Sequence, residues 1–95
     1  MRIESIVCPP YIEEKLQVKH GVTSNEAEQA LRNSPKIRFA GKGHVPGDDL
    51  YAALGRTSSG RYLSVFFIYK PDVKTAIIIS ARNMSKKERK NYGRK

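Results

Sequence analysis

The chain has 95 residues, of which 39% are hydrophobic and 28% are charged, and its formal net charge is +9. This length predicts one domain, residues 1–95, with a modest core, and the aliphatic runs are far too short to span a bilayer. The excess of cations favours a polyanionic partner: nucleic acid, an acidic protein or an anionic membrane surface.

The single cysteine, Cys8, has no partner within the chain for a disulfide, and no Cys/His cluster shows the spacing of metal ligands. The first residues, Met1 to Cys8, contain charges and lack the apolar run of a signal peptide. The sequence therefore predicts a reducing, cytoplasmic location.

The first half of the chain reads as a strand followed by two helices. Arg2–Cys8 has the composition of a short strand, which Pro9 and Pro10 end because neither can donate a ladder hydrogen bond. Tyr11–His20 has helical spacing of its apolar residues, and Gly21 follows where a helix needs a left-handed residue to end.

A capping box begins the second helix at once. Thr23 and Glu26 have the spacing in which each side chain bonds the other's backbone amide. The apolar residues that follow form a narrow stripe that ends near Ser34 and Pro35. The two helices are expected to form an αα-hairpin packed on another layer, because neither stripe is wide enough to support a helix alone.

The second half is predicted to be strands until a final helix. The predicted strands, separated by turn residues, are Lys36–Ala40, Leu50–Thr57, Arg61–Lys70 and Thr75–Arg82. Consecutive strands joined by short turns, such as Ser58–Gly60, pair as an antiparallel meander. A second capping box, Ser85 to Glu88, predicts a helix from near Lys86 to about Tyr92. The expected fold is α+β, in the order β-αα-β-β-β-α, with room for one more strand.

Charge is concentrated at the C-terminus. The last 14 residues, Arg82 to Lys95, hold seven cations and one anion. Such a segment attracts polyanions over a Debye length, although a solvated cationic helix explains the same pattern.

Several short segments together resemble a known family. The segments are Lys19-His20-Gly21-Val22, Leu54-Gly55-Arg56 opposite Gly60-Arg61, Ile79-Ser80-Ala81-Arg82, and Glu88-Arg89 with Tyr92. Their order and spacing, from Ile12 to Tyr92, are similar to the BrnT family of toxins, and the chain resembles a divergent member.

The resemblance implies a RelE-like fold and a small metal-independent endoribonuclease, the toxin of a type II toxin–antitoxin system. It implies that the substrate is RNA and that the enzyme uses no cofactor. It also implies a cognate antitoxin, typically with a ribbon-helix-helix DNA-binding part, that neutralises the toxin in a hetero-oligomer.

Metal-free RNA cleavage needs an acceptor for the 2′-hydroxyl proton, cations for the phosphate and a group that protonates the leaving 5′-oxygen. Histidine suits proton transfer near neutral pH, and the planar arginine fork suits phosphate. The candidate catalytic residues are His20, Arg61, Arg82, Arg89 and Tyr92, and the candidate RNA-binding residues are Lys19, Arg56, Lys86 and Lys90. We expect Arg61, Arg82 and Arg89 to converge on one phosphodiester.

Each candidate also has a structural interpretation. His20 could simply cap its helix, Arg56 could be ordinary hairpin charge, and Tyr92 could pack its helix onto the sheet. Val65–Ile68 is apolar on both faces, which predicts a central strand with Phe66 and Phe67 in the core.

Two further sets of residues are second choices. His44, in the glycine-rich loop 41–47, could close over a substrate. Tyr51 and Tyr69 could contact RNA bases.

Three hypotheses remain open from the sequence. The chain could be an endoribonuclease toxin, a noncatalytic RNA- or antitoxin-binding module of the same fold, or an interaction protein whose charge serves solubility.

Overall fold

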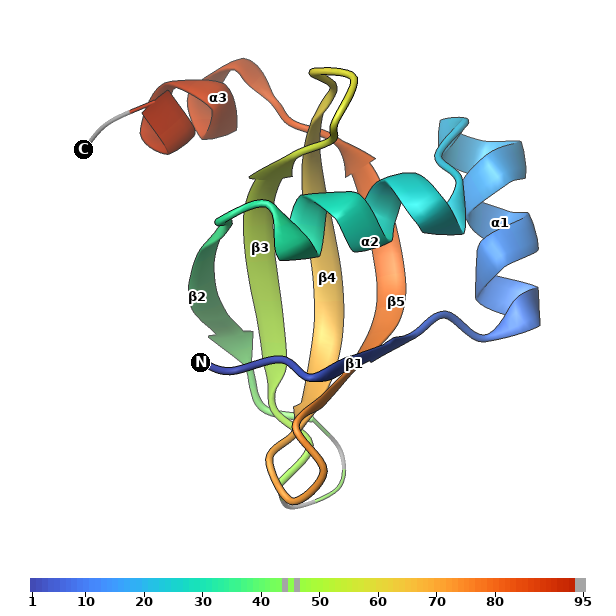
Figure 1. Cartoon of the computed structure of the whole chain (residues 1–95), viewed down its shortest axis with the longest axis vertical. Coiled ribbons are helices and arrows are strands. Elements are labelled where there is room, and N and C mark those ends of the chain that lie inside the picture. Colours follow the sequence, from blue (N-terminus) through green and yellow to red (C-terminus); the bar gives the residue numbers. More distant parts are fainter. Residues whose placement is uncertain (44, 46, 94–95) are drawn as a thin grey trace.

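The computed structural model describes residues 1–43, 45 and 47–93, so the second-choice residue His44 lies outside the described residues. In chain order the elements are β1 (Ser5–Val7), α1 (Pro10–His20), α2 (Ser24–Arg32), β2 (Lys36–Gly41), β3 (Leu50–Arg56), β4 (Tyr62–Lys70), β5 (Thr75–Asn83) and α3 (Lys86–Gly93). Figure 1 shows α1 and α2 on one face of the sheet and α3 beside one end of it.

The sheet has the strand order β1-β5-β4-β3-β2. Strands β2 to β5 form an antiparallel meander, which confirms the predicted α+β class with its αα-hairpin and C-terminal helix. The first strand is shorter than predicted, and it adds a parallel strand by pairing Ser5–Val7 with Thr75–Ile77, the first part of β5. A parallel neighbour is possible because both helices and three strands lie between β1 and β5 in the chain.

Local signals in the sequence account for the ends of both N-terminal helices. Helix α1 begins with Pro10 in its first turn and ends at Gly21, which has a left-handed φ of 60°. The predicted capping box of α2 is present, with the Glu26 amide donating to Thr23 Oγ1 at 3.1 Å and the Thr23 amide donating to Glu26 Oε1 at 3.0 Å. These bonds satisfy amides that a helix start leaves without partners.

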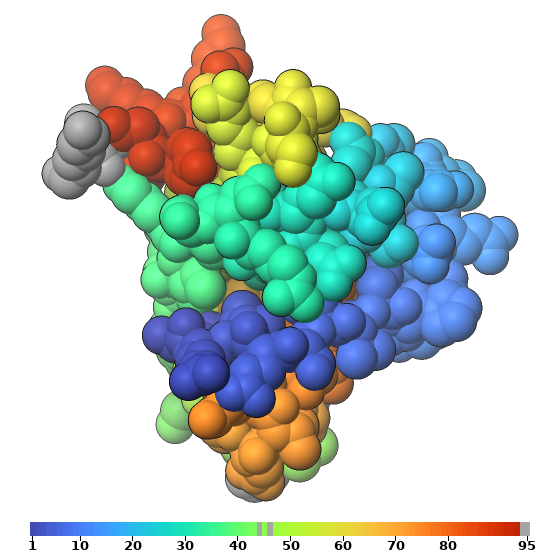
Figure 2. Space-filling model, viewed as in Figure 1, coloured from blue at the N-terminus to red at the C-terminus, as the bar shows by residue number. Residues whose placement is uncertain are grey.

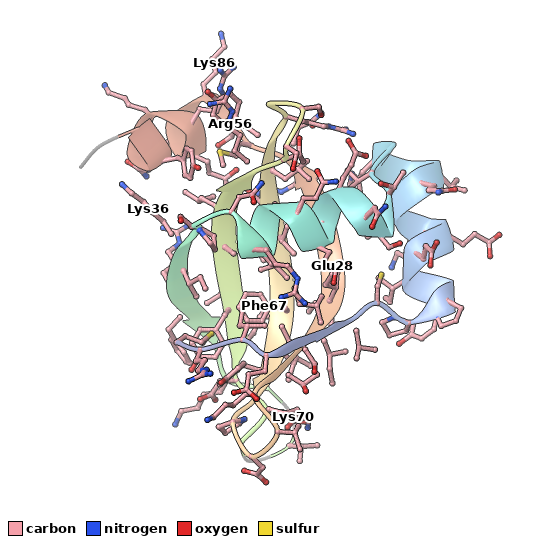
Figure 3. The ribbon with its side chains drawn as sticks, viewed as in Figure 1. Glu28, Lys36, Arg56, Phe67, Lys70 and Lys86 are labelled. Carbon is pink, nitrogen blue, oxygen red and sulfur yellow. The ribbon has the colours of Figure 1, made fainter. Side chains whose placement is uncertain are left out.

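The core lies between the sheet and the helical hairpin. Leu63, Val65 and Phe67 of β4 face α1 and α2 and are fully buried. Figure 3 shows Phe67 in the middle of the sheet. Helix α2 approaches β3 so closely that a Cβ on Gly55 would lie 2.2 Å from the Ala30 carbonyl oxygen. Glycine at position 55 therefore sets the spacing between α2 and the sheet.

The opposite face of the sheet carries a different set of residues. Strand register places Arg56 opposite Tyr62 and Ser64 opposite Arg82, and these side chains face away from α1 and α2. The prediction that Phe66 belongs to the main core is wrong, because Phe66 is partly buried on this second face and Arg82 lies over its ring at 5.4 Å. Only its neighbour Phe67 reaches the helical side.

The two tyrosines considered as base contacts pack against the core. The Tyr51 ring stacks on Phe67 with centroids 5.8 Å apart, and the Tyr69 hydroxyl donates to the Arg2 carbonyl oxygen. Among the described residues, no helix has the length and apolar character needed to cross a membrane.

Candidate functional site

The residues proposed from the sequence lie at one end of the sheet, which we call the hairpin end. It is defined by the turn Thr57–Gly60 and by the adjoining ends of α1, β5 and α3 (Figure 1). Figure 2 shows the hairpin and α3 as adjacent ridges at this end. In Figure 3, Arg56 and Lys86 lie here, whereas Lys70 lies at the opposite end.

Local hydrogen bonds build the turn that defines this end. The Thr57 amide donates to the Arg61 carbonyl at 2.8 Å, and the Gly60 amide donates to the Thr57 carbonyl at 3.0 Å. Gly60 has a φ of 94°, a conformation that favours glycine. The turn places Arg61 and Tyr62, which are adjacent in the chain, on opposite faces of the sheet.

Arg61 lies on the helical face, and its guanidinium is engaged by the protein itself. Nη1 donates to the Gly21 carbonyl at 2.8 Å and to both Glu26 carboxylate oxygens at 3.2 Å, and Nη2 donates to the His20 carbonyl at 3.3 Å. Bonds from the Thr23 amide and from Arg61 lower the pKa of Glu26. Arg61 therefore ties the end of α1 and the start of α2 to the sheet.

Arg82 lies on the second face and pairs with Glu88 through both guanidinium nitrogens. Nη1 donates to Glu88 Oε1 at 2.7 Å and Nη2 donates to Oε2 at 3.0 Å. This bidentate pair lowers the pKa of Glu88 from 4.5 to about 2, with help from the Ser85 amide and the Ser64 hydroxyl, and it raises the pKa of Arg82. The predicted capping box of α3 is thus also an ion pair with the sheet.

Asn83 connects the two arginines. Its side-chain oxygen accepts from Arg61 Nε at 2.9 Å, and its backbone carbonyl accepts from Arg82 Nη1 at 3.1 Å. Asn83 is the last residue of β5, so this link connects an arginine of the helical face with an arginine of the second face at the end of that strand. The two guanidinium groups are therefore neighbours across the end of β5.

The Tyr62 ring is the centre of a second cluster. Arg89 lies over it at 4.3 Å and Arg56 at 5.4 Å, and the Tyr92 ring meets it edge-on with centroids 5.9 Å apart. Lys36 of β2 adds a bond from Nζ to the Asn91 carbonyl at 2.8 Å. These contacts dock α3 on the sheet although α3 has no fully buried residue.

His20 and Lys19 are both exposed, on the last turn of α1. Lys86 and Lys90 are exposed on α3. In Figure 1, α1 and α3 lie on opposite sides of the hairpin end, so the candidate residues are spread along it.

The expectation that Arg61, Arg82 and Arg89 surround one phosphate is wrong. Arg61 lies on the other face of the sheet from Arg82 and Arg89, and its donors are already used by carbonyls and by Glu26. Sequence spacing could not show this, because the side to which a residue points depends on strand register. Arg82 lies over Phe66 on the second face, and Arg89 and Tyr92 contact Tyr62 on the same face.

The sequence placed Glu88 in a capping box but did not identify it as the partner of Arg82, and it did not identify Ser64 or Asn83, which also organise the site. Ser64 is fully buried and donates to Glu88 Oε1 at 2.9 Å. A serine between apolar residues of a central strand was the available signal, because a buried hydroxyl requires a partner. Among the described residues, no group of His, Cys, Asp or Glu side chains is arranged to hold a metal ion.

The chain matches the model of a known protein family. The model of the family described as the ribonuclease toxin BrnT of type II toxin–antitoxin systems matches residues 13–88. The match includes His20, Arg61 and Arg82, and it ends at Glu88. No curated protein matches the chain significantly.

Proposed function

This chain belongs to the BrnT family of type II toxin–antitoxin ribonuclease toxins, and we propose that it cleaves RNA without a metal ion at the hairpin end of its sheet. The single observation that carries this proposal is the family match across residues 13–88. We also propose that a cognate antitoxin with a ribbon-helix-helix part neutralises the chain, and that both act in the cytoplasm.

Cleavage would proceed by attack of the ribose 2′-oxygen on the adjacent phosphorus. The new O2′–P bond forms as the P–O5′ bond breaks, and the 2′-hydroxyl gives its proton to a solvent water molecule while O5′ gains a proton from the protein. His20 is our candidate for the proton donor, because an imidazole suits proton transfer near neutral pH and the residue is exposed on the last turn of α1.

Arg82 is the candidate that stabilises the phosphate in the transition state. Its fork geometry, demonstrated by the two bonds to the Glu88 carboxylate, also suits two oxygens of a phosphodiester. Arg89 and Tyr92 would support it from α3, and Lys19, Arg56, Lys86 and Lys90 would attract the RNA backbone. Arg61 would act by holding the His20 carbonyl and Asn83 in place, as a positioning residue.

A second function has support from the same contacts. Arg61 is engaged by the protein and Arg82 is paired with Glu88, which favours a module that binds RNA or antitoxin and does not cleave. The appearance of RNA fragments distinguishes the two functions, because a binding module binds RNA without cleaving it.

The test is incubation of the purified chain with end-labelled RNA in excess EDTA. We expect fragments whose formation stops when the 2′-hydroxyl at the cleaved position is replaced by hydrogen. His20→Ala and Arg82→Gln should each slow cleavage at least tenfold, while the control Lys74→Gln, at the other end of the sheet, should not. Intact RNA under all conditions, or cleavage that disappears with EDTA, would contradict the proposal.

A further inference from the structure

The Glu88 carboxylate occupies a cradle of hydrogen-bond donors from three parts of the chain. Oε1 accepts from Arg82 Nη1 at 2.7 Å, from Ser64 Oγ at 2.9 Å and from the Ser85 amide at 2.8 Å, and Oε2 accepts from Arg82 Nη2 at 3.0 Å. Ser64 is fully buried, and only 14% of the Glu88 side chain is exposed. The cradle is therefore built into the end of the sheet.

These donors are the ones that an oxyanion requires. A guanidinium fork donates to two oxygens of a phosphate. A hydroxyl group and a backbone amide at a helix start can donate additional hydrogen bonds to one of those oxygens. The carboxylate of Glu88 has the same charge as a phosphodiester and, like it, presents two oxygens that a guanidinium fork can bind. The ion pair holds the Glu88 pKa at about 2, so the cradle is occupied by an anion at every physiological pH.

We propose that Arg82, Ser64 and the Ser85 amide form a binding site for one RNA phosphate, and that Glu88 occupies this site until RNA displaces it. This inference rests on the proposed function, because it assumes that RNA is the ligand of the hairpin end. Glu88 then acts as an internal competitor that weakens RNA binding by the free protein.

The attachment of α3 makes displacement of Glu88 feasible. Helix α3 contains no fully buried residue, and the ring contacts of Tyr62 with Arg89 and Tyr92 are among the contacts that hold it. The cations Lys86 and Lys90 lie on the same helix, so α3 would remain close to an RNA backbone after its carboxylate had left the cradle.

The chain contains a second glutamate–arginine pair, Glu26 with Arg61, which serves as a control for the pair of Glu88 with Arg82. Glu26 is also the third residue of a capping box and also pairs with an arginine of the sheet, Arg61. The Arg61 guanidinium, however, is also bonded to the carbonyls of His20 and Gly21. Removing the Glu26 charge therefore leaves Arg61 bonded to these two carbonyls and to Asn83 Oδ1. Removing the Glu88 charge leaves Arg82 with its bond from Nη1 to the Asn83 carbonyl and makes Nη2 available to another anion.

The experiment compares Glu88→Gln with Glu26→Gln. The probe is a fluorescently labelled single-stranded DNA oligonucleotide, which cannot be cleaved by 2′-oxygen attack, and the readout is anisotropy across a salt series. We expect Glu88→Gln to tighten binding about tenfold and to steepen the salt dependence by about 0.7 in log–log slope, the value for one further phosphate on a single strand. Glu26→Gln should change affinity by no more than about twofold.

Two further variants locate the effect. Arg82→Gln combined with Glu88→Gln should remove the whole gain, and Ser64→Ala in the Glu88→Gln background should remove part of it. A far-ultraviolet circular dichroism melt of each variant confirms that it is folded at the assay temperature.

Equal gains for Glu88→Gln and Glu26→Gln would overturn the inference, since both would then reflect net charge alone. Weaker binding by Glu88→Gln would also overturn it and would assign Glu88 to holding Arg82 in place. The DNA readout does not depend on catalysis. A chain that gains affinity but never cleaves RNA would refute the ribonuclease proposal alone, and a chain that cleaves without the gain would refute the phosphate site alone.

Discussion

The ion pair between Glu88 and Arg82 predicts a specific pH dependence of stability. The Glu88 pKa is about 2 in the folded protein, against 4.5 without its partners. A carboxyl whose pKa is lowered by folding stabilises the protein above its unfolded pKa, and this stabilisation is lost as the pH falls toward the folded pKa. Glu88 should therefore contribute fully above about pH 5 and lose its contribution between about pH 4.5 and pH 2.

The size of the effect follows from the two pKa values. Each pH unit corresponds to about 1.4 kcal/mol, so Glu88 contributes about 3 kcal/mol at neutral pH. The Glu88 side chain is 14% exposed, so solvent screens it weakly. Glutamine retains an oxygen that can accept from the Ser85 amide, so we expect Glu88→Gln to lower the free energy of unfolding by about 2 kcal/mol at pH 7.

The assay is urea denaturation of the wild type and of Glu88→Gln at pH 7, 4 and 2.5. The difference in unfolding free energy between them should be largest at pH 7 and should shrink to less than about 1 kcal/mol at pH 2.5. A difference that stays constant over this range would refute the reasoning, because the stabilisation would then not come from the ionised carboxylate.

Other contacts give predictions that the same assays check. Arg61→Gln should lower the free energy of unfolding by about 2 kcal/mol in urea denaturation, because it removes charged hydrogen bonds to Glu26 and to the carbonyls of His20 and Gly21. The same substitution should leave the salt dependence of oligonucleotide binding unchanged. Gly55→Ala should cost about 3 kcal/mol in thermal denaturation because its Cβ would overlap the Ala30 carbonyl, whereas Gly41→Ala, where a Cβ meets nothing within 4 Å, serves as the control. Arg89→Gln should weaken oligonucleotide binding and reduce the log–log salt slope by about 0.7, and an unchanged slope would show that Arg89 does not contact phosphate.

The features that the sequence predicted well are those fixed by neighbouring residues. Both capping boxes, Thr23 with Glu26 and Ser85 with Glu88, form as their spacing indicates. The left-handed Gly21 ends α1 where it was expected. In each case the physical cause acts within one helical turn, so local spacing is sufficient to predict it.

Pairings between distant residues could not be predicted in the same way. The partners of Arg61 include the carbonyls of His20 and Gly21, which lie about 40 residues away in the chain. Glu88 is only six residues from Arg82, but the two belong to different elements, so their pairing depends on how α3 docks on the sheet. The sequence pattern shows that Arg61 and Arg82 lie near the ends of strands. The face of the sheet to which each side chain points depends on the strand register and on the bulge between Phe66 and Phe67.

The role of Tyr62 illustrates the same limit. Several strand residues are aromatic, and only the packing of α3 distinguishes Tyr62 from the others, because Arg89 and Tyr92 approach its ring from that helix. The structural interpretation of Tyr92, that it packs its helix onto the sheet, agrees with this contact.

The most direct test of the account is a nuclear magnetic resonance titration of arginine side chains with a single-stranded DNA oligonucleotide. We expect the Nε–Hε signals of Arg82 and Arg89 to shift as phosphate binds the second face of the sheet, while that of Arg61 changes little. Shifts at Arg61 without shifts at Arg82 would contradict the assignment of Arg82 as the phosphate-binding residue.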